Sequence, residues 1–225
     1  MKIRRVQYNI NYVHILTFKE EYKALVSPYF KFDKLRYGID NENTIHESVR
    51  LIFQQENILL NLRKEGITFF FEGDVAELKN QNGIIKIFWD LFEGIKKFNA
   101  YHKTLHHSII IHSVDIKDNI EVENILKKCP YFTINPFGKL SEFACIYEYD
   151  QDKINYKFNF GNYSSLDIAK HDLMPFKTKY NDDLLDGIGL MSRLELNEDC
   201  TEPTFSKFKL LLSNAENTLD LFKIK

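Results

Sequence analysis

Two similar stretches lie about half the chain apart in this sequence. Ser-Pro-Tyr-Phe, from Ser27 to Phe30, recurs as Cys-Pro-Tyr-Phe, from Cys129 to Phe132. In both places the stretch closes a predicted short helix that follows a predicted long strand. A repeat with a period near half the chain predicts two similar halves related by a pseudo-twofold axis. The repeat constrains the architecture strongly, but it does not indicate a reaction.

The pattern of the first half predicts a strand, a short helix, three more strands and a long helix. Residues 5–15 alternate between apolar and polar side chains, which is typical of a half-buried strand. Thr17 and Glu20 have the spacing of a capping box at the start of the short helix, and Pro28 ends it. After a polar connection, the remaining elements are expected over 48–55, 58–63 and 67–72 as strands and over 84–98 as the helix.

The second half repeats this order. Residues 106–116 predict the long strand, Asp118 and Glu121 a second capping box, and Pro130 a second stop. Further strands are expected over 142–149, 154–160 and 188–196, an apolar-faced helix over 205–222, and an insertion over 161–184. We therefore predict an α+β fold in which internally duplicated β-α-β-β-β-α units form one curved antiparallel sheet with the helices on one face. The chain would be a single domain with halves 1–100 and 101–225.

This order of elements, found twice, resembles the saddle of the TATA-box-binding-protein-like superfamily. The resemblance covers nearly the whole chain and implies that the first strands of both halves meet at the centre of one sheet, with helices on its convex side. The C-terminal stretch is similar to a sporadically distributed family of uncharacterised prokaryotic proteins. The shared features are Leu194-Glu-Leu196 and a helix ending in Asn217-Thr-Leu-Asp-Leu-Phe222. The patchy distribution implies an accessory or defence-linked bacterial operon.

Composition and charge favour a cytoplasmic protein that does not bind a membrane. Thirty basic and 32 acidic residues give a net charge of −2, which disfavours nucleic acid as the main ligand. The three cysteines have no CxxC spacing, which is typical of a reduced protein with buried thiols. The N-terminus has no signal-peptide pattern, and the longest apolar-rich segment, residues 84–98, is too short to cross a bilayer.

No motif predicts catalysis, a cofactor or a metal. If residues 106–116 form a strand, His106 and His112 share a face but lie about 20 Å apart, at roughly 3.3 Å per residue. His106 and His107 then point to opposite faces, so no set of converging metal ligands can be read from the spacing. Cys129 and Cys145 are interpreted as small core residues. Gly187-Ile-Gly189 opens a strand, which is the wrong context for a phosphate-binding loop.

The polar sides of the predicted strands form the face that the helices leave open. We predict a non-catalytic binding or adaptor protein that presents this face to a protein partner or to its own copy in a dimer. The alternative is an enzyme that processes nucleic acid or a nucleotide with its histidine-rich segment. The insertion is interpreted either as a functional loop or as a helix over the sheet edge. The candidate binding residues are Arg5, Gln7, Asn9, Asn11, Arg50, His106, His112, His171 and Asp172.

Overall fold

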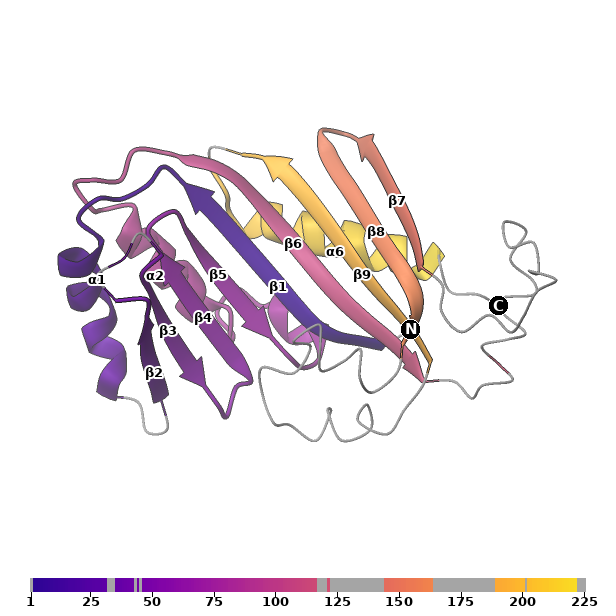
Figure 1. Ribbon diagram of the computed structural model, residues 1–225, viewed down its shortest axis with the longest axis horizontal. Helices are drawn as coiled ribbons and strands as arrows, with labels where there is room; N and C mark the ends of the chain where they lie inside the picture. The colour runs from indigo at the N-terminus through magenta and orange to yellow at the C-terminus, as the bar shows by residue number, and fades with distance from the viewer. Residues whose placement is uncertain are drawn as a thin grey trace.

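The alternating sequence near the N-terminus forms the centre of a sheet. The computed structural model describes residues 2–31, 35–42, 44, 46–116, 121, 144–163, 189–200 and 202–221. Within it, β1 (Lys2–Tyr12) pairs antiparallel with β5 (Gly66–Phe71) on one side and with β6 (Thr104–Ile116) on the other. Successive side chains of a strand point to opposite faces. The apolar set of β1 therefore faces one side of the sheet and its polar set the other. Figure 1 shows β1 between β5 and β6.

The described strands form one nine-stranded antiparallel sheet. Its order is β2-β3-β4-β5-β1-β6-β9-β8-β7. The remaining bounds are β2 (Leu35–Asp40), β3 (Ser48–Phe53), β4 (Ile58–Arg63), β7 (Ala144–Gln151), β8 (Ile154–Tyr163) and β9 (Gly189–Asp199). The predicted α+β class with one antiparallel sheet is confirmed, and so is the expectation that the two long strands share a sheet.

The two wings of the sheet follow the same order outward from the centre. In each wing the last strand of the half lies next to the long strand, and the others follow in reverse chain order. The first wing has one strand more than predicted, because β2 forms where a polar connection was expected. The duplication itself stays a prediction. Of residues 117–143, where the second capping box and proline stop were expected, only Glu121 belongs to the described part of the chain.

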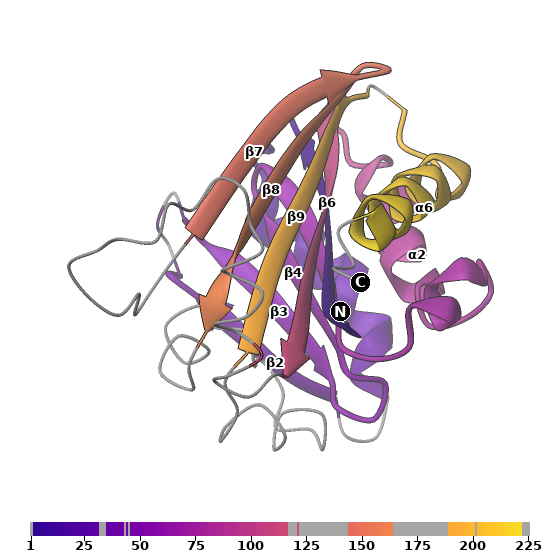
Figure 2. The ribbon, with the colours of Figure 1, turned by 90° about the vertical axis from the view of Figure 1, so that its right-hand side faces the viewer.

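The helices of the described chain cover one face of the sheet (Figure 2). They are α1 (Phe18–Val26), α2 (Lys86–Ile95) and α6 (Phe205–Leu221), with 3₁₀ turns η1 (Ser27–Lys31) and η2 (Val75–Lys79). The predicted capping box of α1 does not form, since Thr17 makes no side-chain cap hydrogen bond. α2 and α6 carry buried apolar side chains at helical spacing, which attaches them to the sheet.

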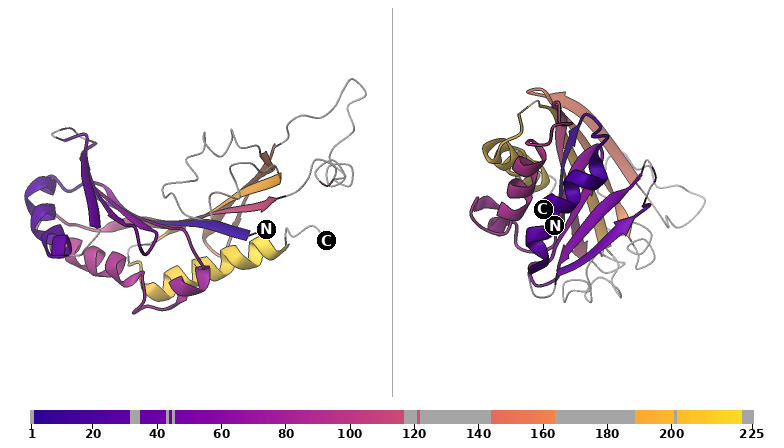
Figure 3. Two further views of the ribbon diagram at one scale, coloured as in Figure 1. Left: turned by 90° about the horizontal axis from the view of Figure 1, so that it is seen from below. Right: turned by 90° about the vertical axis from the view of Figure 1, so that its left-hand side faces the viewer.

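The sheet curves so that its opposite face is concave. Seen from below in Figure 3 (left), α2 and α6 lie beneath the sheet, α1 lies at its left end, and the outer strands of both wings rise away from α2 and α6. Strong twist and curvature are normal for a sheet of this many strands. We call the side of the sheet without described helices the concave face.

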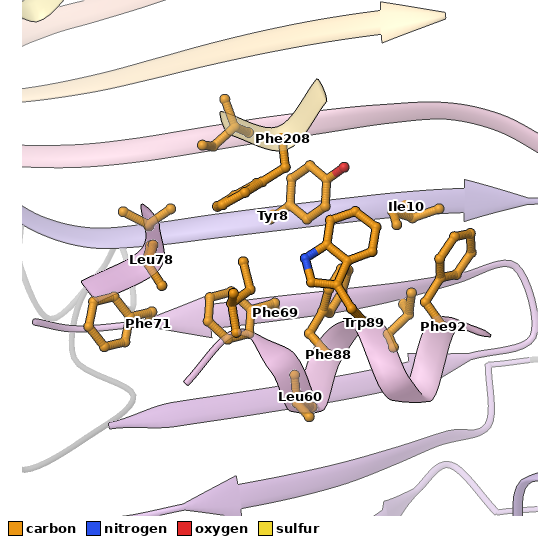
Figure 4. Close-up of a cluster of buried hydrophobic side chains, with 14 of the residues drawn as sticks. Tyr8, Ile10, Leu60, Phe69, Phe71, Leu78, Phe88, Trp89, Phe92 and Phe208 are labelled. Atoms are coloured by element: carbon orange, nitrogen blue, oxygen red, sulfur yellow. The ribbon is translucent and has the colours of Figure 1, made fainter. Parts of the chain in front are cut away.

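A cluster of aromatic side chains holds the two central helices to β1. The ring of Tyr8 lies 4.8 Å from that of Phe208 of α6 and 5.4 Å from that of Phe88 of α2, measured between centroids. Trp89 approaches the same ring at 5.9 Å (Figure 4). Edge-on aromatic contacts of this kind add to the stabilisation from burial alone. One tyrosine therefore connects both helices with the central strand.

Truncating either phenylalanine of this cluster should destabilise the whole fold. Phe88→Ala and Phe208→Ala should each lower the free energy of unfolding by about 3–5 kcal/mol, because each leaves a cavity at a fully buried position. The double variant should deviate from additivity, since both rings contact Tyr8. Urea denaturation measures these changes. Leu210→Ala is the control, because Leu210 of α6 is 55% exposed and its loss should cost less than about 0.5 kcal/mol.

Candidate functional site: a polar row across the concave face

The strand register places the predicted binding residues of the central strands on the concave face. Cross-strand partners lie on the same face of a sheet. Along β1, Arg5, Gln7, Asn9 and Asn11 are opposite His112, Ile110, Ser108 and His106 of β6, respectively. Arg50 of β3 lies on this face as well, three strands away from β1. His171 and Asp172 lie outside the described residues, so their predicted role is not placed by the structure.

One transverse row of the concave face is polar from β3 to β7. The cross-strand pairs connect its members directly, and Gly38 continues the row on β2. We call this set the polar row: Arg50, Asn61, Thr68, Asn9, Ser108, Asn197, Asn155 and Asp150. A neighbouring row shows that this is not general for the face, because Gln7 is followed by Phe70, Leu59 and Ile52. Eight consecutive strands therefore place a hydrogen-bonding side chain at the same level.

Asn9 is the centre of a hydrogen-bond network within this row. Its Oδ1 accepts from Thr68 Oγ1 at 3.0 Å and from Gln7 Nε2 at 3.0 Å. Its Nδ2 donates to Ser108 Oγ at 2.9 Å. Asn9 is 8% exposed, Thr68 3% and Ser108 4%. The middle of the row is thus bound to itself and shielded, contrary to the picture of a uniformly open face.

The ends of the row remain accessible. Arg50 and Asp150 are exposed, and Asn197 and Asn155 are half-buried. Asn155 Nδ2 donates to Asp150 Oδ1 at 3.0 Å, and Asn197 Nδ2 donates to Glu195 Oε1 at 3.1 Å. In addition, Asn61 Oδ1 is buried and accepts no hydrogen bond. Such an acceptor is uncommon in native proteins.

Each wing has an ion pair in or beside the polar row. Arg50 Nε lies 2.6 Å from Asp40 Oδ2 in the first wing. In the second wing, Arg193 Nη2 lies 2.7 Å from Glu195 Oε2. Each cation is partly neutralised by its neighbour, so these two arginines do not form a basic track. The concave face therefore suits a partner that carries both charges and hydrogen-bonding groups.

The predicted residues Arg5 and His112 lie at one side of the polar row and are both largely buried. The guanidinium carbon of Arg5 sits 4.8 Å from the ring centroid of Phe70, and Arg5 Nη2 donates to Gln7 Oε1 at 3.5 Å. Glu72, just past the end of β5, is 2% exposed, and neither of its carboxylate oxygens has a hydrogen-bond partner. Burial raises the pKa of Glu72 to about 8, although the charge of Arg5 opposes this shift.

The predicted histidines do not converge on the concave face. His106 and His112 are both on it, but five residues of β6 separate them. His106 Nε2 accepts a hydrogen bond from Asn11 Nδ2 at 2.8 Å, so it has a structural partner. The described strands do not bring together the histidines on which the alternative hypothesis of an enzyme depends.

A second polar cluster, which sequence reasoning missed, lies under the sheet on the helix side. His107 of β6 is directly opposite Glu198 of β9, and its Nε2 lies 2.8 Å from Glu198 Oε2. On its other side, Nδ1 lies 2.7 Å from the hydroxyl of Tyr8. Cys200 follows two residues after Glu198, and Lys207 Nζ donates to its Sγ at 3.0 Å. We call Tyr8, His107, Glu198, Cys200 and Lys207 the histidine cluster.

The environment of the histidine cluster shifts the pKa values of His107 and Tyr8 so that the imidazole and the phenol stay neutral. Burial lowers the pKa of His107, and the hydrogen bond to Glu198 offsets this only in part. Burial also raises the pKa of Tyr8 well above its usual value. The neutral tautomer that fits both contacts donates from Nε2 to Glu198 and accepts the Tyr8 hydroxyl proton at Nδ1. A buried, fully hydrogen-bonded His–Tyr pair of this kind connects β6 to β1.

Asn9→Val should destabilise the protein, whereas Asn11→Val should have a smaller effect. The first change leaves Thr68 and Ser108 buried without their amide partner, which costs about 1–3 kcal/mol. Asn11 is half-buried, and water can replace its hydrogen bond to His106. Thermal and urea unfolding of the two single variants measures the difference. Equal stability of Asn9→Val and the unchanged protein would contradict the network described above.

Glu72 should make the folded state less stable as the pH rises toward 8. Its folded pKa is raised above the unfolded value of 4.5, so its contribution is fully present below pH 4.5 and is lost as the pH rises through about 8. The slope cannot exceed about 1.4 kcal/mol per pH unit for one group. The measurement is the difference in free energy of unfolding between the unchanged protein and Glu72→Gln from pH 5 to 9, which cancels the opposite trend expected from His107. A difference that is constant with pH would show that Glu72 titrates normally.

Two arrangements in the described part of the chain are candidates for a function: the concave face and the histidine cluster. None of the helices in the described part of the chain is long and apolar enough to cross a membrane. The concave face and the histidine cluster are built from strands far apart in sequence, so neither would show as a short motif. No protein-family model matches the sequence, and no curated protein matches it either.

Proposed function

We propose that this chain is a non-catalytic binding or adaptor protein whose concave face receives a protein partner or a second copy of the chain. The observation that carries the proposal is the polar row, which crosses eight strands without an apolar side chain. Strands favour β-branched and aromatic residues, so strand propensity does not explain a continuous row of polar side chains. A binding role for the face would account for it. A row of amides and hydroxyls offers donors and acceptors along one line.

The dimensions of the polar row favour an elongated segment of the partner. Neighbouring strands lie about 4.8 Å apart, so eight strands give a row about 34 Å long. An extended chain of roughly 10 residues spans that distance at about 3.3–3.6 Å per residue. The exposed ends at Arg50 and Asp150 would make the first polar contacts, while the shielded middle keeps the sheet in register. A continuous segment that crosses the strands fits this layout better than a compact ligand does.

The charges of the concave face favour a protein over a polyanion. Nucleic-acid binding depends on cations that neutralise phosphates. Here Arg50 and Arg193 already have carboxylate partners, and Glu148 and Asp150 add negative charge at the edge strand β7. Mixed charges beside uncharged hydrogen-bonding groups are common on protein interfaces, where they set specificity more than affinity.

The two sequence resemblances are consistent with this proposal in different ways. A curved sheet with both long strands at its centre and helices on the convex side supports the likeness to the TATA-box-binding-protein-like saddle as an architecture. From the C-terminal resemblance we propose that the adaptor belongs to a bacterial accessory or defence-linked operon. Cys200 is a free thiol, which supports a reducing, cytoplasmic location.

Changing the accessible ends of the polar row should abolish partner capture without unfolding the protein. The test variant is Arg50→Glu with Asn155→Lys, at an exposed and a half-buried position. The matched control is Lys209→Glu with Asn217→Lys, which makes the same charge changes at exposed positions of α6. Each tagged protein is used for capture from the native host with quantitative mass spectrometry, and light scattering reports self-association. Melting curves confirm that both variants are folded.

The expected result is that the control keeps the partner, or the dimer, and the row variant loses it at least tenfold. Photo-crosslinking residues at position 50 and at position 155 should then attach to the same partner chain, since one elongated segment reaches both ends. Retention of the partner by the row variant would overturn the proposal. So would a protein that is monomeric at all concentrations and captures no partner above the background of the control.

A further inference from the structure

Three metal-binding atoms converge in the histidine cluster, on the opposite side of the sheet from the polar row. The ligand atoms of His107, Glu198 and Cys200 all lie within 4.8 Å of one another. His107 and Cys200 are buried, while Glu198 is partly exposed, so the cluster opens to solvent on one side. The three come from the start of β6, the end of β9 and the residue after it, next to the first turn of α6.

We propose that His107, Glu198 and Cys200 form a binding site for a divalent cation of the zinc class. Imidazole nitrogen, carboxylate oxygen and thiolate sulfur are the three donor types that zinc takes in proteins. Around one tetrahedral ion such atoms lie about 3.3–3.8 Å apart, as follows from bond lengths of about 2.0–2.3 Å. His107 and Glu198 would separate slightly from their 2.8 Å contact, and the sulfur would move inward. Rotation of the partly exposed Glu198 side chain allows this.

The hydrogen bond of Tyr8 orients the imidazole for this role. Metal-binding histidines usually use their second ring nitrogen for a hydrogen bond that fixes the ring. Here the hydroxyl of Tyr8, 2.7 Å from Nδ1, occupies that position and leaves Nε2 directed at Glu198. With the ion bound, the ring proton moves to Nδ1, and the Tyr8 oxygen accepts it as a hydrogen bond. The imidazole stays neutral, because its proton only moves from one ring nitrogen to the other, and Cys200 binds the ion as a thiolate.

Lys207 contacts the sulfur that the ion would bind. Its Nζ donates to Cys200 Sγ at 3.0 Å, so a cation already contacts this group. Lys207 is on the first turn of α6 and its side chain is long, so it can turn outward when a divalent ion enters. A carboxylate and a thiolate then neutralise the two charges of the ion. Of the four tetrahedral positions, three are filled by protein, and water reaches the fourth from the side of Glu198.

Local sequence patterns do not predict this site, because its ligands are not close along the chain. His107 and Glu198 are 91 residues apart, and the expectation of no metal rested on the spacing of histidines and cysteines alone. Glu198 lies near the end of β9 and Cys200 directly after it, and only the β6–β9 register adds the histidine to them. The site is independent of partner binding on the concave face.

The test uses Co²⁺ as a spectroscopic substitute for Zn²⁺ in a protein that keeps one thiol. The sequence has three cysteines, so Cys129→Ser with Cys145→Ser leaves Cys200 as the single sulfur ligand. Titration of this untagged, reduced variant with Co²⁺ should produce a thiolate-to-cobalt charge-transfer band that saturates at one ion per chain. Zn²⁺ should then displace the cobalt and bleach the band. Zinc should also raise the melting temperature, because it binds the folded state.

Single changes in this background separate ligands from neighbours. Cys200→Ser should abolish the charge-transfer band, and Glu198→Gln should weaken Zn²⁺ binding at least tenfold in competition titrations. Tyr8→Phe, which removes only the orienting hydroxyl, should weaken binding about 10–100-fold. Lys207→Gln should strengthen it, since the competing cation is gone. Stronger Zn²⁺ binding by Lys207→Gln is not expected if the cluster only stabilises the fold.

Three outcomes would overturn the site. One is the lack of a charge-transfer band in the single-thiol protein while that protein is folded by circular dichroism. Another is unchanged zinc affinity in both Cys200→Ser and Glu198→Gln. The third is binding of more than one ion per chain with no preference among these variants, which indicates adventitious binding to surface histidines and carboxylates. His107→Gln is not needed for the decision, so a folding defect at that fully buried position does not matter.

Discussion

The antiparallel register between β1 and β6 is the constraint on which the rest of the structure depends. It places Asn9 against Ser108 and Ile10 against His107, and through these pairs it sorts both strands into a helix side and a concave side. A shift of one residue would turn every side chain to the other face. The aromatic ring of Tyr8 would then leave the helices, and the amide of Asn9 would enter an apolar core. Both faces therefore stabilise the same register, one by burial and the other by hydrogen bonds.

Buried amides add little to the stability of a sheet, but they select one strand pairing over the alternatives. The three hydrogen bonds of Asn9 contribute little net stability, because water would make similar bonds in the unfolded chain. Breaking them in a wrong arrangement is expensive, since the polar atoms would be buried without partners. The centre of the polar row thus acts mainly against alternative pairings. Its outer members are accessible to water and are not needed to specify strand pairing, so they can take part in recognition.

Local pattern predicted the long elements well, because alternation and helical spacing are properties of adjacent residues. β4, over Ile58–Arg63, has the predicted bounds, and the apolar spacing of α6 was visible from Phe208 onward. β2 was missed because its sequence, LRYGID, is short, contains two charged residues and a glycine, and lies at the edge of the sheet, where half of its side chains are exposed. The capping box of α1 was predicted from spacing, but spacing does not establish that the Thr17 side chain turns toward the helix.

The sites were less predictable than the elements because they depend on register. Alternation was enough to place Arg5, Gln7, Asn9 and Asn11 on one face, but it could not show that Asn9 would be shielded by its neighbours. Likewise, nothing local associates His107 with Glu198 and Cys200. An acid and a thiol two residues apart are a weak signal alone. They gain meaning only when the pairing of two strands, 91 residues apart at His107 and Glu198, is known.

The two edge strands have a consequence for how the protein behaves in concentrated solution. β2 and β7 are the outer strands of the described sheet, and an outer strand can add a strand from another molecule. On β7, Glu148 and Asp150 are exposed, so two such edges repel each other electrostatically. At 0.1 M ionic strength, salt largely screens repulsion between exposed charges that lie more than about 10 Å apart. Colloidal stability should therefore depend on the ionic strength of the buffer more than on the packing of the core, with high salt favouring edge-to-edge association.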